Sequence, residues 1–183
     1  MPTLYPLVMG REVMVASEHY LSASAGARMF ARGGNAIDAA LAATLVEGVV
    51  NPHMHTIGGE APMLIYSAKA RRVLAINGNM IAPARATIAH YRSLGLKLVP
   101  HSGLLAAGVP AAFDAIITAL TEFGTMTFGD IAEPALKLAE DGFPVHVGLA
   151  GEKNIDASNP QHAGAGASIR NFAEKFRTEW PST

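Results

Sequence analysis

The sequence contains no cysteine among its 183 residues, and this absence excludes disulfide bridges, thiolate metal sites and cysteine nucleophiles together. Charged residues are scarce, at 16%, and the formal net charge is −1 with no basic run. Such a chain lacks the electrostatic surface that binds nucleic acid or an anionic membrane. The longest strongly apolar run, 36–50, is interrupted by Asp38 and Glu47 and is too short to cross a bilayer. We therefore expect a soluble globular protein with no nucleic-acid or membrane partner.

The first residues show no charged segment followed by a long apolar core, so no secretory signal is visible. Together with the missing cysteines this favours a reducing, cytoplasmic compartment, although many exported proteins also lack cysteine. Half of the residues are hydrophobic, which excludes a disordered chain. The length suits one domain.

Local signals bound two helices near the N-terminus. Residues 21–32 are mostly small and are followed by a Gly-Gly pair, which is typical of a helix C-terminus. Asn35 and Asp38 have the spacing of a capping box and predict a second helix over 35–50, which the Asn-Pro pair at 51–52 ends. Because nearly every face of this second helix is apolar or small, we expect it to be buried on several sides.

Strands are few in the remaining pattern. Short apolar, β-capable segments predict strands, and turn residues separate them from the helices. The expected elements are strands at 12–17, 62–67 and 72–76, the last two forming a hairpin, and helices at 86–94 and 111–123. A sheet with so few strands and uncovered edges predicts that the chain is part of something larger.

The second half of the chain carries one further helix signal beside the helix at 111–123. The 111–123 helix has Phe113, Ile116, Ile117 and Leu120 on one side.

The next helix is capped by Thr127 and Asp130 and ended by Gly142. Pro134 lies inside its pattern and predicts either a kink or the first residue of a new helix.

Read from the residues alone, candidate reactive groups do not assemble into a centre. His53, His55 and Glu60 are of types that bind zinc or iron, but their spacing is not that of a common zinc site, so a structural loop is the simpler interpretation. The Gly58-Gly59 pair is too short for a phosphate-binding loop. No serine lies in a G-x-S-x-G elbow. We expect no metal and no cofactor.

Several runs resemble the N-terminal region of the large subunit of γ-glutamyltransferases. These runs are M-V-A-S-E-H-Y-L-S-A-S-A-G from Met14, G-G-N-A-I-D-A-A from Gly33, G-V-V-N-P-H-M from Gly48 and I-G-G-E-A-P-M-L from Ile57. The match resumes at Ala82-Pro83, at Gly108-Val109-Pro110, at Phe123 to Met126 and at Glu140 to Val145. It covers nearly the whole chain up to about residue 150. Each run alone is a weak signal, but the set is specific.

The resemblance implies an N-terminal-nucleophile hydrolase fold, in which two β-sheets are sandwiched between helical layers (αββα). It implies a precursor that cleaves itself and a nucleophilic threonine at the new N-terminus of the smaller chain. The α-amine of that threonine serves as its base. The threonine attacks an amide carbonyl to give an acyl-enzyme, and backbone N–H groups of the smaller chain stabilise the oxyanion.

No catalytic residue is expected in this chain, because the resemblance stops before the processing site. Thr183 is the last residue and is not the exposed nucleophile, so we interpret the end of the sequence as arbitrary. Residues 1–183 are then one partial domain, with a change of texture over 157–183. The expected partners are the rest of the large subunit, the smaller catalytic chain of the same precursor and a small-molecule amide substrate.

One departure from the family pattern concerns the substrate. Family members acting on γ-glutamyl compounds carry D-F-R-E-x-A-P, or close to it, after the second hairpin strand, and its Arg holds the substrate α-carboxylate. Here Asn79 stands in place of that Arg and Met80 in place of the Glu, while the spacing of Arg85 argues against its replacing the Arg. We predict Asn79 as a substrate-binding residue and expect little or no γ-glutamyl transfer. The alternative role of Asn79 is to fill a turn at the strand end.

Two other hypotheses remain open at this point. One is a genuine γ-glutamyltransferase that recognises the carboxylate through other residues. The other is a non-catalytic module that stands alone.

A smaller departure from the family pattern is Ala111, where relatives usually have Gly.

Overall fold

The structure, a computed structural model, describes residues 8–146, so the predicted change of texture over 157–183 lies outside the described residues. The chain divides into two compact units, which are described separately. The first draws on Met1–Ile81 and Pro110–Phe143, and the second includes Ala82–Val109.

The first unit begins with the two helices that the local signals predict. Helix α1 (Tyr20–Ala31) ends where Gly33 adopts φ +88°, a left-handed conformation that glycine favours. Helix α2 (Ala36–Val50) starts with the complete capping box of Asn35 and Asp38. Both predicted helices and their termini are confirmed.

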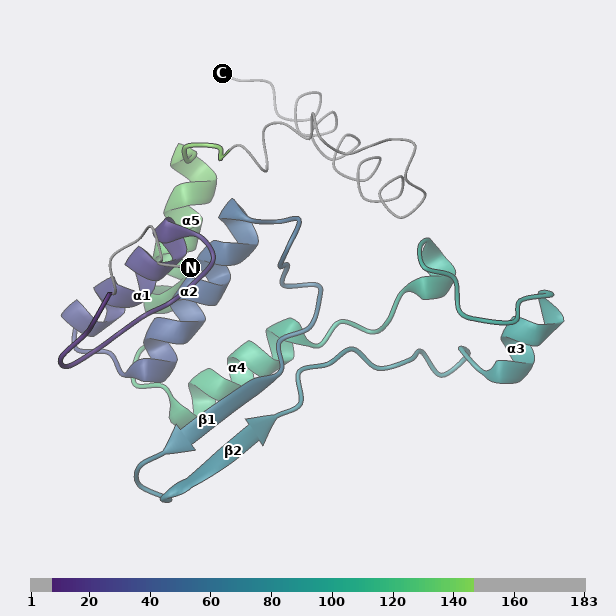
Figure 1. Cartoon of the computed structure of the whole chain (residues 1–183), viewed down its shortest axis with the longest axis horizontal. Coiled ribbons are helices and arrows are strands. Elements are labelled where there is room, and N and C mark those ends of the chain that lie inside the picture. The colour runs from purple at the N-terminus through teal and green to yellow at the C-terminus, as the bar shows by residue number, and fades with distance from the viewer. Residues whose placement is uncertain (1–7, 147–183) are drawn as a thin grey trace, which may run out of the picture. The chain divides into compact units, whose positions relative to one another are not determined.

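Helix α2 is the centre of the first unit, as its apolar faces predict. It packs against α1, against α4 (Ala112–Phe123) and against α5 (Phe128–Asp141) (Figure 1). Leu41, Val46 and Val50 are fully or almost fully buried along it. Alanines between these residues allow the neighbouring helices to approach closely.

Asp38 joins the start of α2 to the connection between α4 and α5. Its carboxylate accepts the Thr125 N–H at 2.9 Å, the Thr125 hydroxyl at 2.6 Å and the Met126 N–H at 3.1 Å. Burial raises the pKa of Asp38, but these hydrogen bonds and one from the Asn35 N–H outweigh it and hold the pKa below its ordinary value. Most donors that keep this fully buried carboxylate ionised come from Thr125 and Met126, which lie 87 and 88 positions away in sequence.

The predicted hairpin is confirmed. Strands β1 (Met63–Ser67) and β2 (Arg72–Ile76) pair antiparallel, with Ile65 opposite Leu74 and Tyr66 opposite Val73. Ile65, on one face of the hairpin, belongs to the same core cluster as buried residues of α2 and α4. The opposite face is apolar and open, because Leu64, Tyr66 and Val73 are exposed to 80, 67 and 61%.

The predicted strand at 12–17 is wrong for this structure, which assigns no strand there. A strand requires a neighbouring backbone for its hydrogen bonds, and within residues 8–146 the only sheet is the β1–β2 hairpin. Residues 14–17 instead lie along α2.

The predicted helix at 111–123 is confirmed, and its apolar side is buried only in part. Helix α4 buries Ala112, Ala115, Ile116 and Ala119, while Phe113 is 45% exposed. The closest packing is made by small side chains, and the Phe113 ring lies edge-on against Phe128 with centroids 5.9 Å apart.

Helix α5 decides between the two predictions for Pro134, a kink within one helix or the first residue of a new helix. It is one helix from Phe128 to Asp141 with Pro134 inside it, opened by the predicted capping box of Thr127 and Asp130. Gly142, with φ +83°, ends it as predicted.

The second unit is small. It contains α3 (Ile88–Ser93), which confirms the predicted short helix, and the 3-10 turn η1 (Leu104–Ala106). The Tyr91 hydroxyl donates to the Leu105 carbonyl at 2.7 Å and ties the two together. Over residues 8–146 no helix is both long and apolar enough to cross a membrane.

Candidate functional site

The residues that directly follow β2 include Asn79, the predicted substrate-binding residue. Gly78 is buried there, and its carbonyl accepts the Ala61 N–H at 2.9 Å. A Cβ atom on Gly78 would lie 2.2 Å from the Ala61 carbonyl oxygen and 2.9 Å from the Ala115 Cβ. Only glycine fits this approach, so the turn at 77–80 is held against residues 60–61 and the start of α4.

Asn79 lies exposed on this turn. Its side-chain Nδ2 donates to Asn77 Oδ1 at 2.7 Å, and its backbone N–H reaches the same oxygen at 3.4 Å. One of the two amide hydrogens of Asn79 is therefore used within the turn, and its side-chain carbonyl oxygen has no partner among the described residues. The role of Asn79 in substrate binding stays a prediction.

Glu60 is brought to the same turn, which the sequence did not indicate. Its Oε1 accepts the Met80 N–H at 3.0 Å, so the carboxylate lies beside the peptide bond that joins Asn79 to Met80. Glu60 and Met80 are 20 positions apart in the sequence, and the β1–β2 hairpin brings them together.

The Gly-Gly pair connects this turn to helix α4. The Gly59 carbonyl accepts the N–H groups of Ala111 at 3.2 Å and Ala112 at 3.1 Å, which satisfies two donors at the helix start. Ala111 has φ −127°, a conformation open to any residue, so the usual family glycine is not required there.

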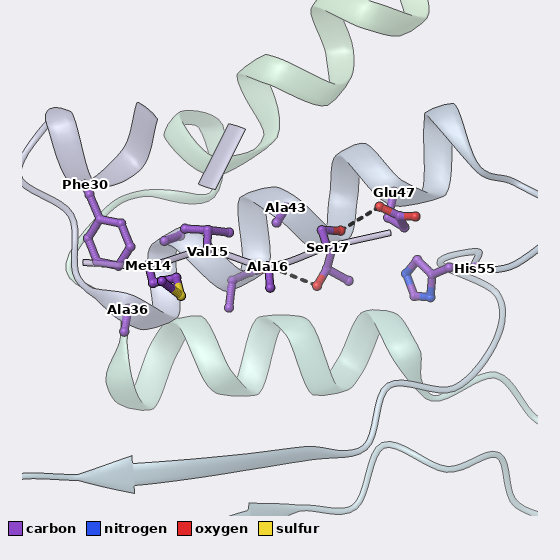
Figure 2. Close-up of a pocket in the computed structure, with 12 residues that line it drawn as sticks. Met14, Val15, Ala16, Ser17, Phe30, Ala36, Ala43, Glu47 and His55 are labelled. Atoms are coloured by element: carbon purple, nitrogen blue, oxygen red, sulfur yellow. Dashed lines mark hydrogen bonds between the residues drawn. The ribbon is translucent and has the colours of Figure 1, made fainter. Parts of the chain in front are cut away.

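A second feature of the first unit is a cavity of about 400 Å³ between residues 14–17 and α2. Alanines of α2 line it, with Phe30 and Met14 at one end and Glu47 and His55 at the other (Figure 2). It is therefore apolar at one end and polar at the other.

Hydrogen bonds converge on Glu47 at the polar end. Ser17 Oγ donates to one carboxylate oxygen at 2.8 Å, and Asn51 Nδ2 donates to the other at 2.9 Å. Burial raises the pKa of Glu47, but these bonds, with contributions from Ser22 and the His19 backbone, hold the pKa below its usual range. Glu47 is thus a stabilised anion and a poor general base.

His55 lies at the same end but does not complete a catalytic pair. Burial lowers its pKa, and the opposing charge of Glu47 only partly restores it. Its Nε2 is buried without a hydrogen-bond partner, while the Ser17 hydroxyl is bonded to Glu47 and lies 2.9 Å from Ser22 Oγ. No serine–histidine pair forms here, so the cavity lacks the geometry for nucleophilic catalysis.

The structure disperses the other candidate residues. Within residues 8–146 no three side chains of His, Asp or Glu gather as metal ligands, so His53, His55 and Glu60 do not form a site. Ser67 accepts the Ala70 N–H in the hairpin turn, which is a structural role. Arg85 is exposed and belongs to the second unit.

Comparison with known proteins identifies the family. The family model described as gamma-glutamyltranspeptidase matches residues 22–168, which is most of the chain. This chain belongs to the gamma-glutamyltranspeptidase family. It is 37% identical over 161 residues to the glutathione hydrolase-like YwrD proenzyme of Bacillus subtilis (strain 168), and covers 30% of that protein with 85% of its own length. It is 35% identical to the acylase ACY 1 proenzyme of Pseudomonas sp. (strain SE83), over 74% of this chain and 26% of that protein.

The solved structures agree with these relatives. The crystal structure of Helicobacter pylori gamma-glutamyltranspeptidase matches 75% of this chain and 40% of its own, with a TM-score of 0.69 and 32% identity. The present chain therefore supplies part of an N-terminal-nucleophile hydrolase αββα fold. Its match is to the N-terminal part of the large subunit, as the resemblance implied.

The chain spans about a quarter to a third of the two curated relatives named above, at 30 and 26% of their lengths. Both are named as proenzymes, and the family comprises autoprocessed hydrolases and transferases that include acylases. The expected family is thus confirmed at that level.

Proposed function

We propose that this chain is the N-terminal part of the large subunit of an autoprocessed amidohydrolase or acyltransferase. The family match over residues 22–168 supports the proposal. The nucleophile is a threonine outside these residues, freed when the precursor cleaves itself, and it forms an acyl-enzyme with an amide substrate. Residues 1–183 then belong to one domain of the assembled enzyme.

We further propose that γ-glutamyl groups are not the preferred acyl groups. The single observation that carries this is Asn79, which stands on an exposed turn in place of the family arginine and donates one amide hydrogen to Asn77. A guanidinium offers a charged, bidentate donor to a carboxylate, whereas Asn79 offers neither the charge nor the bidentate geometry. The similarity to a relative that is named an acylase supports this proposal.

The open face of the hairpin supports the proposed partners. A sheet face bearing Leu64, Tyr66 and Val73 is too apolar to remain in water in an assembled enzyme. In an αββα sandwich the face of one sheet packs against the second sheet. We assign this face to a contact with the rest of the same precursor.

A test requires the complete precursor. On expression, it should appear as two chains, and Edman sequencing of the smaller chain should begin at threonine. Replacing that threonine by alanine should leave one uncleaved, inactive polypeptide. A complete precursor that stays in one piece without such a substitution would contradict the proposal and favour a non-catalytic module.

A further inference from the structure

The turn at 77–80 and the segment bonded to it carry hydrogen-bond acceptors and no cationic residue. The segments 57–63 and 76–81 contain no Lys, Arg or His. Glu60 uses Oε1 for the Met80 N–H, and within residues 8–146 its Oε2 has no partner. Asn79 uses its Nδ2 for Asn77, and its Oδ1 likewise has no partner in the described part of the chain. The turn at 77–80 and the Glu60 carboxylate bound to it therefore offer two oxygen acceptors, one of them charged.

The frame that holds these acceptors is rigid. The Ala61–Gly78 hydrogen bond and the close approach at Gly78 fix the turn against residues 60–61. The Met80 N–H holds the Glu60 carboxylate on that turn. A charged group in a fixed position discriminates between ligands because its partner loses little freedom on binding.

The sign of the charge is the opposite of what a substrate carboxylate needs. A carboxylate has no hydrogen to donate, and Glu60 repels it. A protonated amine has hydrogens to donate to such oxygens and is attracted by the charge of Glu60, and charge-assisted bonds of this kind are about twice as strong as neutral ones.

We propose that Glu60 is a specificity-determining residue and that the acyl group recognised here carries a protonated amine and no carboxylate beside it. The substrate class is amides of amino acids that offer an ammonium group to the turn. This inference rests on the proposed function, because it takes the turn at Asn79 as the acyl-binding end of the site.

Matched p-nitroanilides test the proposal on the complete, processed enzyme. The γ-aminobutyryl compound has the ammonium alone, the glutaryl compound has the carboxylate alone, and the butyryl compound has neither. We expect kcat/KM for γ-aminobutyryl to exceed that for butyryl by about tenfold, the ratio typical of one charge-assisted hydrogen bond. Glutaryl should be the poorest. A preference for glutaryl over butyryl would overturn the proposal.

Glu60→Gln isolates the charge, because the glutamine Oε1 still accepts the Met80 N–H. The γ-aminobutyryl to butyryl ratio of kcat/KM should fall about tenfold towards one. The control is Glu122→Gln, the same substitution on an exposed face of α4, which should leave the ratio unchanged. An unchanged ratio in a processed Glu60→Gln enzyme would contradict the assignment.

A measurement without any variant covers the case in which Glu60→Gln does not mature. Salt screens an exposed carboxylate, so raising sodium chloride to about 0.5 M should reduce the γ-aminobutyryl preference of the wild-type enzyme and leave butyryl turnover nearly constant. A preference that is insensitive to salt would argue against Glu60 as its source.

Failure of this inference is distinguishable from failure of the proposed function. A processed enzyme that turns over none of the anilides contradicts the proposed amide chemistry. Calorimetric titration with γ-aminobutyramide and with glutaramate then tests recognition alone. Tighter binding of γ-aminobutyramide supports the role of Glu60, whereas equal, absent or reversed binding overturns it.

Discussion

The helices around Asp38 and the turn around Asn79 lie in the same unit and use their polar groups in opposite ways. Both oxygens of Asp38 are occupied by donors from the α4–α5 connection. At the turn, Glu60 and Asn79 each keep an acceptor without a partner in the described residues. Buried polar groups must be satisfied within the protein, whereas exposed acceptors are available to a ligand. The first region maintains the fold, and the second is suited to recognition.

The two faces of the hairpin show the same contrast in apolar form. The side of Ile65 is packed in the core, and the side of Leu64 is open. Alternation along a strand places successive side chains on opposite faces, so β1 is apolar on both. Strands of that kind are typical of a sheet covered on two sides.

Leu64→Asp should therefore have the largest effect of the substitutions considered. If the rest of the precursor covers the open face, the new carboxylate is buried without a partner, and we expect loss of the processed two-chain enzyme. Gel analysis of the expressed precursor measures this. Ala68→Asp, in the exposed hairpin turn, is the matched control and should process normally. Normal processing of Leu64→Asp would show that the face stays open.

Asp38→Ala should be the next most damaging change. It leaves the N–H groups of Thr125 and Met126 without their acceptor, and we expect a loss of about 3 kcal/mol in the free energy of unfolding. The thermal midpoint of the complete enzyme measures it. Asp114→Ala, at an exposed position of α4, should cost no more than about 0.5 kcal/mol. Equal effects of the two substitutions would remove the distinction between the regions.

The Asp38 carboxylate should also make the stability of the protein depend on pH. Because the folded-state pKa of Asp38 is below its ordinary value of 3.8, its contribution is fully present above that pH. The contribution is lost as the pH falls through the lower, folded-state pKa. The stability difference between wild type and Asp38→Ala should therefore shrink in strong acid, and a difference that grows there would contradict this account.

Gly78→Ala tests whether the turn at 77–80 is held rigidly. The added methyl group meets the Ala61 carbonyl, a backbone atom, so the turn must shift, and we expect a loss of about 1–3 kcal/mol. Substrate selectivity should change at the same time. Gly129→Ala is the control, because its Cβ has only ordinary contacts and alanine favours the helix. Unchanged stability and selectivity in Gly78→Ala would show that the turn is not rigid.

Thr127→Ala should have the smallest effect. It removes the capping box at the start of α5, which is typically worth about 1 kcal/mol. The hydroxyl and N–H of Thr127 also lower the pKa of Asp130, and that effect should weaken. Thr118→Ala, exposed within α4, should be neutral, and the difference in thermal midpoint between the two variants is the measurement. No difference would mean that the cap contributes nothing.

The sequence predicted elements whose signals are local. Caps at Asn35 and Thr127 and the left-handed Gly33 and Gly142 concern neighbouring residues, so their helices were placed correctly. The strand at 12–17 failed because pairing depends on a second backbone, which a local pattern does not reveal.

Residues of the candidate site, too, could be predicted only where the signal was local. Asn79 is predicted as a substrate-binding residue because it departs from a family motif, and that role stays a prediction. Glu60, by contrast, is placed by the sequence only in a structural loop with a metal site as the alternative, because its contact with Met80 depends on the register of the hairpin. The bond from Asp38 to Thr125 spans 87 positions, and no local signal indicates it.

The most direct test of the central claim is the turnover of γ-glutamyl-p-nitroanilide by the complete, processed enzyme and by its Asn79→Arg variant. If the turn recognises the acyl group and Asn79 cannot hold a carboxylate, wild-type kcat/KM is low. The variant should then gain about tenfold or more from the restored charge-assisted contact. High wild-type turnover that Asn79→Arg leaves unchanged or lowers would contradict the account.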